Sequence, residues 1–563
     1  MREPSRESAT NQHTSVSGLF ARDVGLSVAG RPLLVGASFA VAAGRKVALV
    51  GRNGSGKSTL LETVLRVAEE GRPPDHVELS GRIQLGPGTV VAAVRQDVQL
   101  SFAGSVDAYL DRCAGEASRA WNEHERWSRL LARGRDDAET LAGYGGALEE
   151  MTRVEAWDYP ARRQRVLDGL HLSPALGGRE VATLSGGEAT RVALAGVLLS
   201  PASLVLLDEP SNNLDLESIG FLADWIRRST AALLLVSHDR ELLDATVQEI
   251  IEIEESSGRL LSFGGDYTFY AARKREAFEA QLKAFQEQQE RQRRLETSAE
   301  GLARRADRFQ NTSQNDFYRA KAARVSRAAS AQRSRIRRQL NAAEEPAPPA
   351  QPRFQVQPPA ITSGTVVRTQ GLGFGYSGQP LLQGLDVSLR AGRRLAVTGP
   401  NGSGKSTLLR LLAGELEPAA GVVERASGLR VGYLPQLSLP DPEESALDFV
   451  LRRVDAPGEE VRAILGKVLF GDPARLRAAD LSVGQLRRVE CAALFASRPD
   501  LLLMDEPTNH IDLPTIDMLE RALDDYGGAV IACSHDRRFL AHLRPDARLA
   551  LQAGAAAVYS SDL

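Results

Sequence analysis

The sequence predicts an α/β protein in which one phosphate-binding domain occurs twice, with a long α-helical hairpin between the copies. Two glycine-rich segments, 51–59 and 399–407, differ at one position and lie 348 residues apart. Each follows a short Val/Leu-rich run and precedes a helix-forming segment, which is the strand–turn–helix context of a phosphate loop. At 563 residues the chain is also too long for one hydrophobic core, so more than one domain is expected.

The repeat extends well beyond the glycine-rich segments. Residues 184–188 (LSGGE) return as 481–485 (LSVGQ), and residues 204–210 (LVLLDEP) return as 501–507 (LLLMDEP). The serine of the first motif precedes the aspartate of the second by 23 residues in both copies. Matched spacing over this length indicates a tandem duplication.

The glycine-rich segments predict two ATP-binding loops. Successive backbone N–H groups of such a loop surround a phosphate at a helix N-terminus, where the helix dipole also favours negative charge. The lysines are expected to reach the β- and γ-phosphates, and the serines that follow them are expected to ligate Mg²⁺. The predicted residues are Gly51, Asn53, Gly54, Ser55, Gly56, Lys57, Ser58 and Thr59, and Gly399, Asn401, Gly402, Ser403, Gly404, Lys405, Ser406 and Thr407.

Two apolar runs that end in Asp-Glu predict the hydrolytic groups. The aspartate is expected to hold the hydration shell of the metal, and the glutamate to act as the general base on the attacking water. A Ser-His pair at matched spacing in both copies places a histidine within reach of the γ-phosphate. These residues are Asp208, Glu209 and His238 in the first copy and Asp505, Glu506 and His535 in the second.

Together these motifs resemble the ATP-binding cassette, with LSGGE as its signature. The resemblance implies that two cassettes pack head to tail, each ATP lying between one phosphate loop and the other cassette's signature. It also implies Gln96 and Gln436 as ligands of the nucleotide and of Mg²⁺. ATP binding is expected to close the cassettes, and hydrolysis to release them. Site one would pair Lys57, Gln96, Glu209 and His238 with Ser482, Val483, Gly484 and Gln485; site two would pair Lys405, Gln436, Glu506 and His535 with Ser185, Gly186, Gly187 and Glu188.

The two sites are predicted to differ. Tyr376 is placed to stack on an adenine at site two, whereas its counterpart in the first copy is Val28. Site one also faces the signature that has Val483 where the other copy has glycine. We expect weaker nucleotide binding or slower turnover at site one, with neutral variation as the alternative.

The segment between the copies is strongly basic. From Tyr270 to Asn341 it holds 18 Lys/Arg against 8 Asp/Glu, a net charge of +10, whereas the whole chain has a net charge of −3. Fifteen of the 18 basic residues are arginines, and aromatic residues lie near the middle, a pattern that favours phosphate backbones and stacked bases over a merely solvated helix pair. RNA is the expected nucleic acid. The predicted contact residues of the tip, 304–317 and just beyond, are Arg304, Arg305, Arg308, Phe309, Phe317 and Tyr318.

The remaining domain boundaries follow from composition and spacing. The first copy is longer by 43 residues between its Gln and its signature, which predicts a helical arm at about 115–160. That arm holds three of the four tryptophans, expected to pack it rather than to bind a ligand. The expected domains are a polar tail (1–17), cassette 1 (18–265), a basic helical-hairpin linker (266–343), a Pro-rich tether (344–363) and cassette 2 (364–563).

With the linker included, the chain resembles the ABC-F family of twin-cassette ATPases that act on the ribosome. The resemblance rests on residues 264–270 (GGDYTFY), 505–512 (DEPTNHID) and 534–540 (SHDRRFL); the first copy is looser, with 208–215 (DEPSNNLD). It implies binding in the tRNA exit site, with the linker directed toward the P-site tRNA and the 23S rRNA of the peptidyl-transferase centre. It also implies either protection of that region from antibiotics of the macrolide, lincosamide or streptogramin type or, as an alternative, relief of stalled ribosomes.

Other function classes fit the sequence less well. The three cysteines lie far apart in the sequence, which argues against a disulfide framework and against a structural zinc site. No apolar run reaches the ~18 residues that span a bilayer. We therefore expect a cytoplasmic monomer in which the cassettes pair within one chain. The ATP-binding subunit of an antibiotic efflux transporter is the second alternative, but its linker would need no concentrated positive charge. A DNA-repair or chromosome ATPase would need a longer coiled coil.

Overall fold

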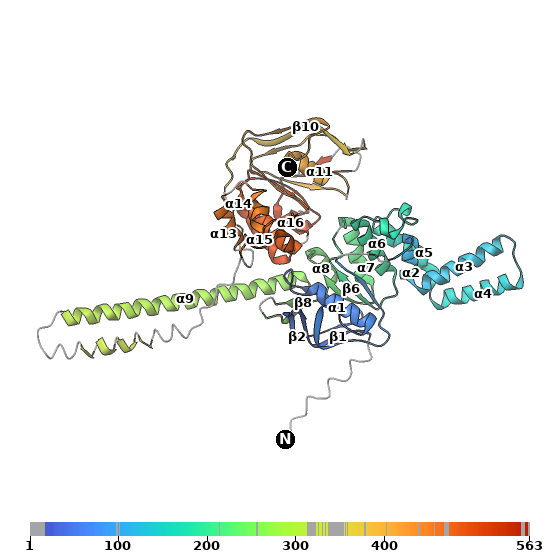
Figure 1. Cartoon of the computed structure of the whole chain (residues 1–563), viewed down its shortest axis with the longest axis horizontal. Helices are drawn as coiled ribbons and strands as arrows, with labels where there is room; N and C mark the ends of the chain where they lie inside the picture. The colour runs from blue at the N-terminus through green and yellow to red at the C-terminus, as the bar shows by residue number, and fades with distance from the viewer. Residues whose placement is uncertain are drawn as a thin grey trace, which may run out of the picture. The chain divides into compact units, whose positions relative to one another are not determined.

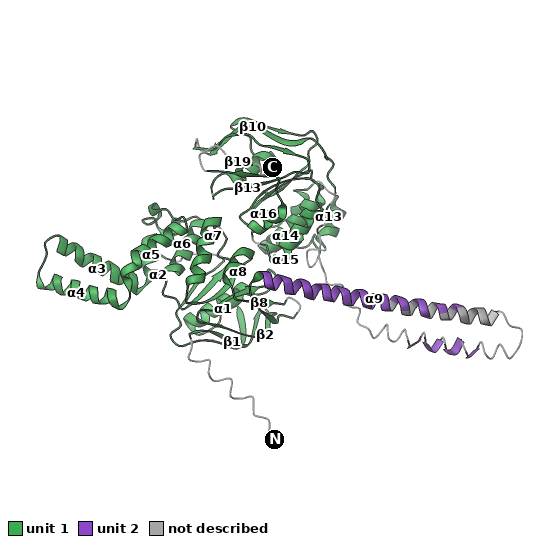
Figure 2. Cartoon of the chain, turned by 180° about the vertical axis from the view of Figure 1, so that it is seen from behind, with its two compact units in different colours: residues 1–267, 353–563 green, residues 268–352 purple. Residues whose placement is uncertain are grey.

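The molecule contains two compact units, residues 1–267 with 353–563 and residues 268–352 (Figure 2). The first unit holds both cassettes and the second holds the linker. The computed structural model describes residues 17–96, 100, 102–212, 214–254, 257–311, 323–324, 326–328, 330–332, 334–335, 354, 356, 358–376, 379–400, 402–436, 440–454, 457–466, 472–509, 511–552 and 558–560.

A six-stranded sheet forms the centre of each cassette, and the two sheets have the same strand order. The order is β5-β6-β7-β3-β8-β9 in cassette 1 and β15-β16-β17-β13-β18-β19 in cassette 2. The first five strands of each sheet are parallel and the last is antiparallel to its neighbour. The strands are β3 (Lys46–Val50), β5 (Val91–Val94), β6 (Leu204–Asp208), β7 (Ala232–Val236), β8 (Glu249–Ile253), β9 (Leu260–Gly264), β13 (Arg394–Thr398), β15 (Val431–Leu434), β16 (Leu501–Asp505), β17 (Ala529–Cys533), β18 (Ala547–Ala550) and β19 (Val558–Ser560).

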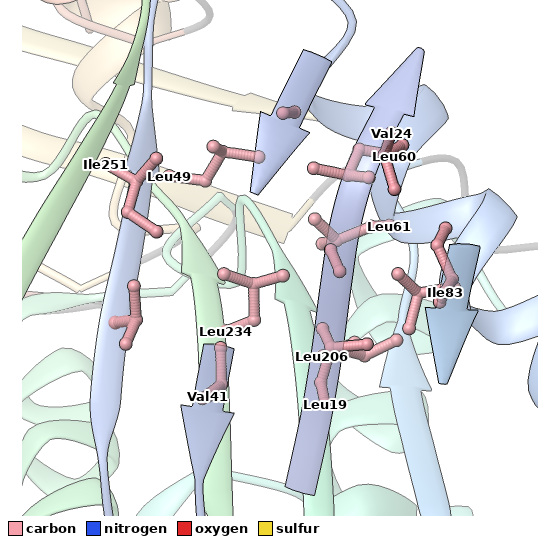
Figure 3. Packing of buried hydrophobic residues seen from close by; sticks show 14 of the residues in the cluster. Leu19, Val24, Val41, Leu49, Leu60, Leu61, Ile83, Leu206, Leu234 and Ile251 are labelled. Atoms are coloured by element: carbon pink, nitrogen blue, oxygen red, sulfur yellow. The ribbon is translucent and has the colours of Figure 1, made fainter. Parts of the chain in front are cut away.

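A smaller antiparallel sheet covers one face of each central sheet. Its strands are β1 (Gly18–Val28), β2 (Arg31–Ala42) and β4 (Val77–Leu85) in cassette 1, and β10 (Thr365–Tyr376), β11 (Gln379–Leu385), β12 (Ser388–Arg390) and β14 (Ala420–Arg425) in cassette 2. In cassette 1, Leu19 of β1 lies opposite both Val41 of β2 and Leu85 of β4. The main core packs this sheet, helix α1 (Lys57–Glu70) and the central sheet together through Leu19, Val41, Leu60, Leu61, Ile83, Leu206, Leu234 and Ile251 (Figure 3).

The central strands are apolar except at their ends because both of their faces are covered. Strands β3, β6 and β7 are buried at every position, as are β16 and β17. Continuous apolar runs of this kind are typical of parallel strands in α/β proteins. The α/β fold with two tandem cassettes is thus as the sequence predicts.

Helices complete the cassettes. Those of cassette 1 are α2 (Val106–Ala114), α3 (Glu116–Ala132), α4 (Ala138–Arg153), α5 (Tyr159–Gly169), α6 (Gly186–Leu199), α7 (Leu216–Arg228) and α8 (Arg240–Thr246), with 3₁₀ turns at Ala156–Asp158, Pro174–Leu176 and Val181–Thr183. Those of cassette 2 are α11 (Lys405–Ala413), α12 (Ala446–Leu451), α13 (Gly458–Leu465), α14 (Val483–Ala496), α15 (Leu513–Asp525) and α16 (Arg537–Leu543), with a 3₁₀ turn at Ala478–Asp480.

Helices α3 and α4 occupy the segment where the sequence predicts a helical arm (Figure 1). Trp121 packs on a small cluster with Ala120 and Met151. Trp127 packs so closely on Gly143 that a Cβ there would overlap its indole ring. Trp157 differs, with 52% of its surface exposed.

The second unit begins with one long helix. Helix α9 (Tyr267–Asn311) has 45 residues, and the described residues between 323 and 335 are also helical. Of the predicted tip, residues 304–311 continue helix α9, whereas residues 312–317, with Phe317, lie outside the described residues, as does Tyr318. Arg304 lies on α9 and is exposed, whereas the side chains of Arg305, Arg308 and Phe309 fall outside the description. Within the described part of the chain, no helix has the length and apolar character needed to cross a membrane.

Candidate nucleotide-binding sites

The two phosphate loops have matching geometry. Gly56 and Gly404 precede helices α1 and α11 in a left-handed conformation, with φ of 98° and 96°. A side chain is disfavoured there, so glycine lets the loop curl around the helix N-terminus. The Lys57 ammonium lies over its loop and donates to the carbonyls of residues 51 and 52 at 2.8 and 3.0 Å. Lys405 donates to the equivalent carbonyls at 2.7 and 3.1 Å.

Strands β6 and β16 deliver the two acidic pairs to the same end of their sheets as the phosphate loops. Glu209 and Glu506 follow these strands in a left-handed conformation, with φ of 50° and 44°. Such a conformation costs a non-glycine residue of order 1–3 kcal/mol and persists where neighbours enforce it. Each glutamate's backbone N–H donates to the next strand, to the carbonyl of Val236 at 2.8 Å or of Cys533 at 2.9 Å.

A histidine stands beside each glutamate. The backbone N–H of His238 donates to Glu209 at 3.3 Å, and that of His535 donates to Glu506 at 3.1 Å. Their Nε2 atoms lie 3.4 and 3.3 Å from the second carboxylate oxygen. The sequence-predicted base and histidine are therefore neighbours in both copies.

Burial shifts the proton affinity of these groups. It raises the pKa of Glu209 to about 8, against the opposing effect of Lys57, and the pKa of Glu506 to about 7, against Lys405. Burial lowers the pKa of His535 to about 4, with Lys405 adding to the effect. At neutral pH a base near 7 is suited to accept a proton from water.

Each signature motif forms a helix N-terminus. Ser185 and Ser482 are the N-caps of α6 and α14, and each closes a reciprocal capping box with the residue three positions later, Glu188 or Gln485. The first backbone N–H groups of a helix have no acceptor within the helix, so those not used by the capping box can bind a ligand. Together with the dipole they favour an anion at this point.

The structure brings each phosphate loop together with the other cassette's signature. A cavity of about 340 Å³ is lined by Asn53, Gly54, Gly56, Lys57, Ser58, Thr59, Gln96, Asp208, Glu209 and His238 of cassette 1 with Ser482 and Gly484 of cassette 2. A cavity of about 360 Å³ is lined by Gly402, Gly404, Lys405, Ser406, Thr407, Gln436, Asp505, Glu506 and His535 of cassette 2 with Ser185, Gly187 and Glu188 of cassette 1.

Comparison with known proteins agrees with this architecture. The family profile described as "ABC transporter" matches residues 34–212 and 382–509. The probable ATP-binding protein YheS of Escherichia coli K12 is 32% identical over 516 residues, covering 91% of this chain and 75% of its own length. Human ATP-binding cassette sub-family F member 3 is 31% identical over 535 residues, covering 92% and 68%.

The chain belongs to the ABC-F family. It is an ATPase with two ATP-binding domains. Among solved structures, that titled "RNase-L Inhibitor" aligns with a TM-score of 0.56 and 18% identity, over 95% of this chain and 89% of that one. A model of ribosome-bound archaeal Pelota and ABCE1 aligns at 0.54 and 20%, over 95% and 78%. At identities of 18% and 20%, these similarities show only that the fold is shared.

Some predicted residues of this ABC-F protein do not line its cavities. The residues that are absent from the lining are Gly51, Ser55, Gly399 and Ser403 of the phosphate loops and Gly186 and Gln485 of the signatures. Asn401 and the side chain of Val483 fall outside the described residues. Tyr376 is 49% exposed and packs edge-on against Phe374 at 5.1 Å between ring centroids, without lining the cavity.

The cavities also contain residues that the sequence analysis did not select. Leu33 and Leu381 provide an apolar wall, and Asn212 and Asn509 lie beside the glutamates. Both pairs occupy equivalent positions of the repeat, 348 and 297 residues apart, so comparison of the two copies would have found them. A carboxylate oxygen of Asp512 accepts from the backbone N–H of Asn53 at 3.1 Å, a contact between the cassettes that only the structure reveals.

Proposed function

We propose that each cavity binds one Mg·ATP, and that the chain uses this ATP cycle on the ribosome in the cytoplasm. The binding of ATP is supported by the residues that line the cavities. Neither cavity takes all of its phosphate-binding and catalytic residues from one cassette. The phosphate loop and glutamate come from one half and the signature helix from the other. A nucleotide that contacts both halves would hold them together, so hydrolysis would favour their separation.

The residues present fit a magnesium ion held jointly with phosphate oxygens. Ser406 hydrogen-bonds to Asp505, and Gln436 lines the same cavity. Among the described residues no cluster of three or more acidic, His or Cys side chains could hold a metal alone. Mg²⁺ usually takes one or two protein carboxylates together with substrate phosphates. When bound, it would neutralise phosphate charge, while Lys405 would orient the phosphates and Glu506 would accept a proton from water.

The linker supports a nucleic-acid partner, but its two halves differ. Residues 267–311 of helix α9 hold 10 Lys/Arg and 7 Asp/Glu. Among its described side chains, Arg273 pairs with Glu276 at 3.0 Å and Arg294 pairs with Glu290 at 2.6 Å. Residues 312–341 hold 8 Lys/Arg and only 1 Asp/Glu. The excess of positive charge therefore lies mainly in residues 312–341, which we call the return half of the predicted hairpin. Solved structures with a related fold include an archaeal ribosome recycling factor in complex with a ribosomal stalk protein, and ribosome-bound archaeal Pelota and ABCE1. This supports ribosomal RNA as the partner.

Sedimentation tests this function. The Glu209→Gln/Glu506→Gln variant, which should bind ATP without hydrolysing it, is expected to sediment with ribosomes through sucrose when ATP is present. Recovery in the light fractions only would reject the proposal. Phosphate contacts also predict that the association weakens as salt rises.

Paired charge variants test the assignment to the linker. Arg324→Gln/Arg327→Gln removes two exposed charges from the return half, and Arg273→Gln/Arg294→Gln removes two that are already paired on α9. The first variant should weaken ribosome binding and reduce its salt dependence, and the second should change both much less. Equal effects would mean that the linker contributes only general charge.

Two downstream effects remain open to the same chain. One is protection of the peptidyl-transferase region, at the exit site and P-site tRNA, from macrolide, lincosamide or streptogramin antibiotics. The other is relief of stalled ribosomes as a general translation factor. In a host that lacks the gene, rescue of growth only in the presence of drug supports the first. Restored elongation on a stalling messenger without drug supports the second.

A further inference from the structure

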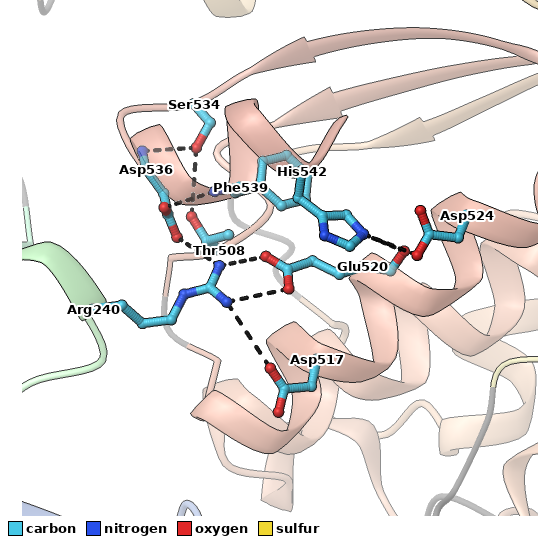
Figure 4. Close-up of polar contacts among 9 residues, drawn as sticks. All are labelled: Arg240, Thr508, Asp517, Glu520, Asp524, Ser534, Asp536, Phe539 and His542. Carbon is cyan, nitrogen blue, oxygen red and sulfur yellow. Dashed lines mark hydrogen bonds and ion pairs between the residues drawn. The ribbon is translucent and has the colours of Figure 1, made fainter. Parts of the chain in front are cut away.

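Arg240 joins the two cassettes at a point between their nucleotide sites. It follows His238 and Asp239 directly and is the first residue of α8. The residue is 7% exposed. Its side chain reaches α15 of cassette 2, where the guanidinium makes a bidentate pair with Glu520, one bond being 3.1 Å (Figure 4). It also lies 3.5 Å from Asp536 and 3.9 Å from Asp517. Asp536 follows His535, so one side chain links both histidine loops.

The contact exists on one side only of the duplicated molecule. The residue equivalent to Arg240 in cassette 2 is Arg537, which is exposed. The positions in cassette 1 equivalent to Glu520 and Asp517 are Ala223 and Gly220, which carry no charge. A mere consequence of the duplication would appear twice. The acidic groups on α15 and the buried arginine therefore form a feature specific to this side.

The two histidine loops also share a small cavity. It has a volume of about 50 Å³ and is lined by His238, Asp239, His535 and Asp536, together with residues that follow Glu209. Burial raises the pKa of Asp239 to about 6, and the like charge of Asp536 adds to this effect. Two neighbouring carboxylates repel, and Arg240, whose guanidinium lies 3.5 Å from Asp536, supplies a cation that offsets this repulsion.

The linker helix starts at the same cluster. Tyr267 is the first residue of α9 and is 6% exposed. The guanidinium of Arg538, in cassette 2, lies 5.7 Å from the centre of its ring. Arg538 also pairs with Asp244 of α8. The ion pairs that cross between the cassettes thus adjoin the one place where the chain leaves cassette 1 for the linker.

We propose that Arg240 is a positioning residue that couples the two nucleotide sites by holding the His238 loop against the His535 loop. It acts through Asp536 and Glu520, so that occupancy of one site changes the position of the histidine in the other. The inference rests on the assignment of the two cavities as ATP sites, and it is independent of the ribosome.

Two backgrounds of the full-length chain isolate the coupling. Glu506→Gln leaves site two able to bind ATP but unable to hydrolyse it, whereas Lys405→Ala weakens ATP binding there. In both, only site one turns over. The ratio of kcat in the two backgrounds measures how far occupancy of site two is transmitted to site one, and we expect a ratio of several-fold in the parent chain.

Arg240→Gln should bring this ratio close to one, and the matched control Arg537→Gln should leave it unchanged. Arg240→Lys, which keeps the charge but loses the bidentate geometry, should restore part of the ratio. A ratio that Arg240→Gln leaves at the parent value would overturn the proposal, whatever the melting temperature does. A parent ratio of one would overturn it as well.

Two further variants check that Arg240 acts through Glu520. Glu520→Gln removes the partner from the other side, so it should act like Arg240→Gln, and the double variant should be no worse than either single one. Additive losses would mean that the two residues act separately, which contradicts the proposal. ATPase that survives Lys57→Ala/Lys405→Ala would instead reject the assignment of the sites, which distinguishes that failure from a failure of the coupling.

Discussion

The two nucleotide sites have the same strands and helices, but their glutamates are held differently. In cassette 2, Arg487 on α14 is 3% exposed and donates to the carbonyls of Asp505 and Glu506 at 3.0 and 3.3 Å. Its counterpart Thr190 on α6 donates only to its own helix, at Gly186, at 2.9 Å. The helix whose N-terminus faces site one is thus bonded to the loop of the site-two glutamate. Duplication has preserved the framework while the polar contacts around each glutamate have diverged.

Replacement of each glutamate in turn gives the largest test of this difference. Loss of a general base lowers the rate at its own site by about 10²–10⁴-fold. Since the signature at site one has Val483 where the other signature has Gly186, we expect Glu506→Gln to remove most of the ATPase activity and Glu209→Gln to remove the smaller share. Steady-state phosphate release measures both. Equal losses would show that the two sites work at the same rate.

Arg487 provides the second test. Arg487→Met removes the ion-pair partner of the buried Glu490, which lies at 3.3 Å, and breaking a buried pair typically costs about 3–5 kcal/mol. Because the loop of Glu506 is then released, turnover at site two should fall more than turnover at site one. The former is measured in the Glu209→Gln background and the latter in the Glu506→Gln background. Thr190→Val is the matched control in the other cassette, expected to change neither.

Much of the framework could be predicted from the sequence because its signals are local and repeated. The strands that end at Asp208 and Asp505 are short apolar runs followed by acidic pairs, and the loops that precede Lys57 and Lys405 require glycine at fixed positions. The pairing of each loop with the opposite signature came from the resemblance to a known family, and the cavities agree with it.

The contacts that distinguish the sites could not be predicted in this way. Arg240 and Glu520 are 280 residues apart in the chain, and neither belongs to a pattern of hydrophobic spacing. A charged residue on a helix is usually solvated, so its burial depends on which surface of the other cassette meets it. Tyr376 is the opposite case. Its position in the repeat predicted that it stacks on an adenine, but in the structure it is half exposed and does not line the cavity.

The dependence of activity on pH gives a third test. A protonated glutamate cannot accept a proton, so activity should rise with pH through the pKa of each base. With kcat/KM, which reports the free enzyme, the rise should be centred near pH 7 for site two and near pH 8 for site one, following Glu506 and Glu209. The single Gln variants separate the two profiles. Coincident pH profiles would show that the two glutamates have the same pKa, which contradicts an electrostatic difference between the sites.

The same pKa values predict an effect on stability without ATP. In the unfolded chain both glutamates have an ordinary pKa of 4.5. Between pH 4.5 and about 7, Glu209 and Glu506 therefore stay protonated in the native chain but are ionised in the unfolded chain. The contribution of these groups to stability is thus complete below pH 4.5 and is lost as pH rises through about 7 and 8. Glu209→Gln should therefore raise the melting temperature at pH 8.5 more than at pH 5.5. An equal change at both values would contradict the raised pKa.

The smallest expected effect concerns the closeness of the signature to the phosphate loop at site one. A methyl group added at Gly484 would overlap the side chain of Asn53. The Asn53 side chain can turn aside, so we expect a cost of about 1 kcal/mol, or roughly a fivefold rise in the KM for ATP at site one. Gly484→Ala in the Glu506→Gln background measures this rise, and Gly187→Ala, at the equivalent position of the other signature, is its counterpart at site two in the Glu209→Gln background. A larger rise for Gly187→Ala would mean that site two closes more tightly than site one.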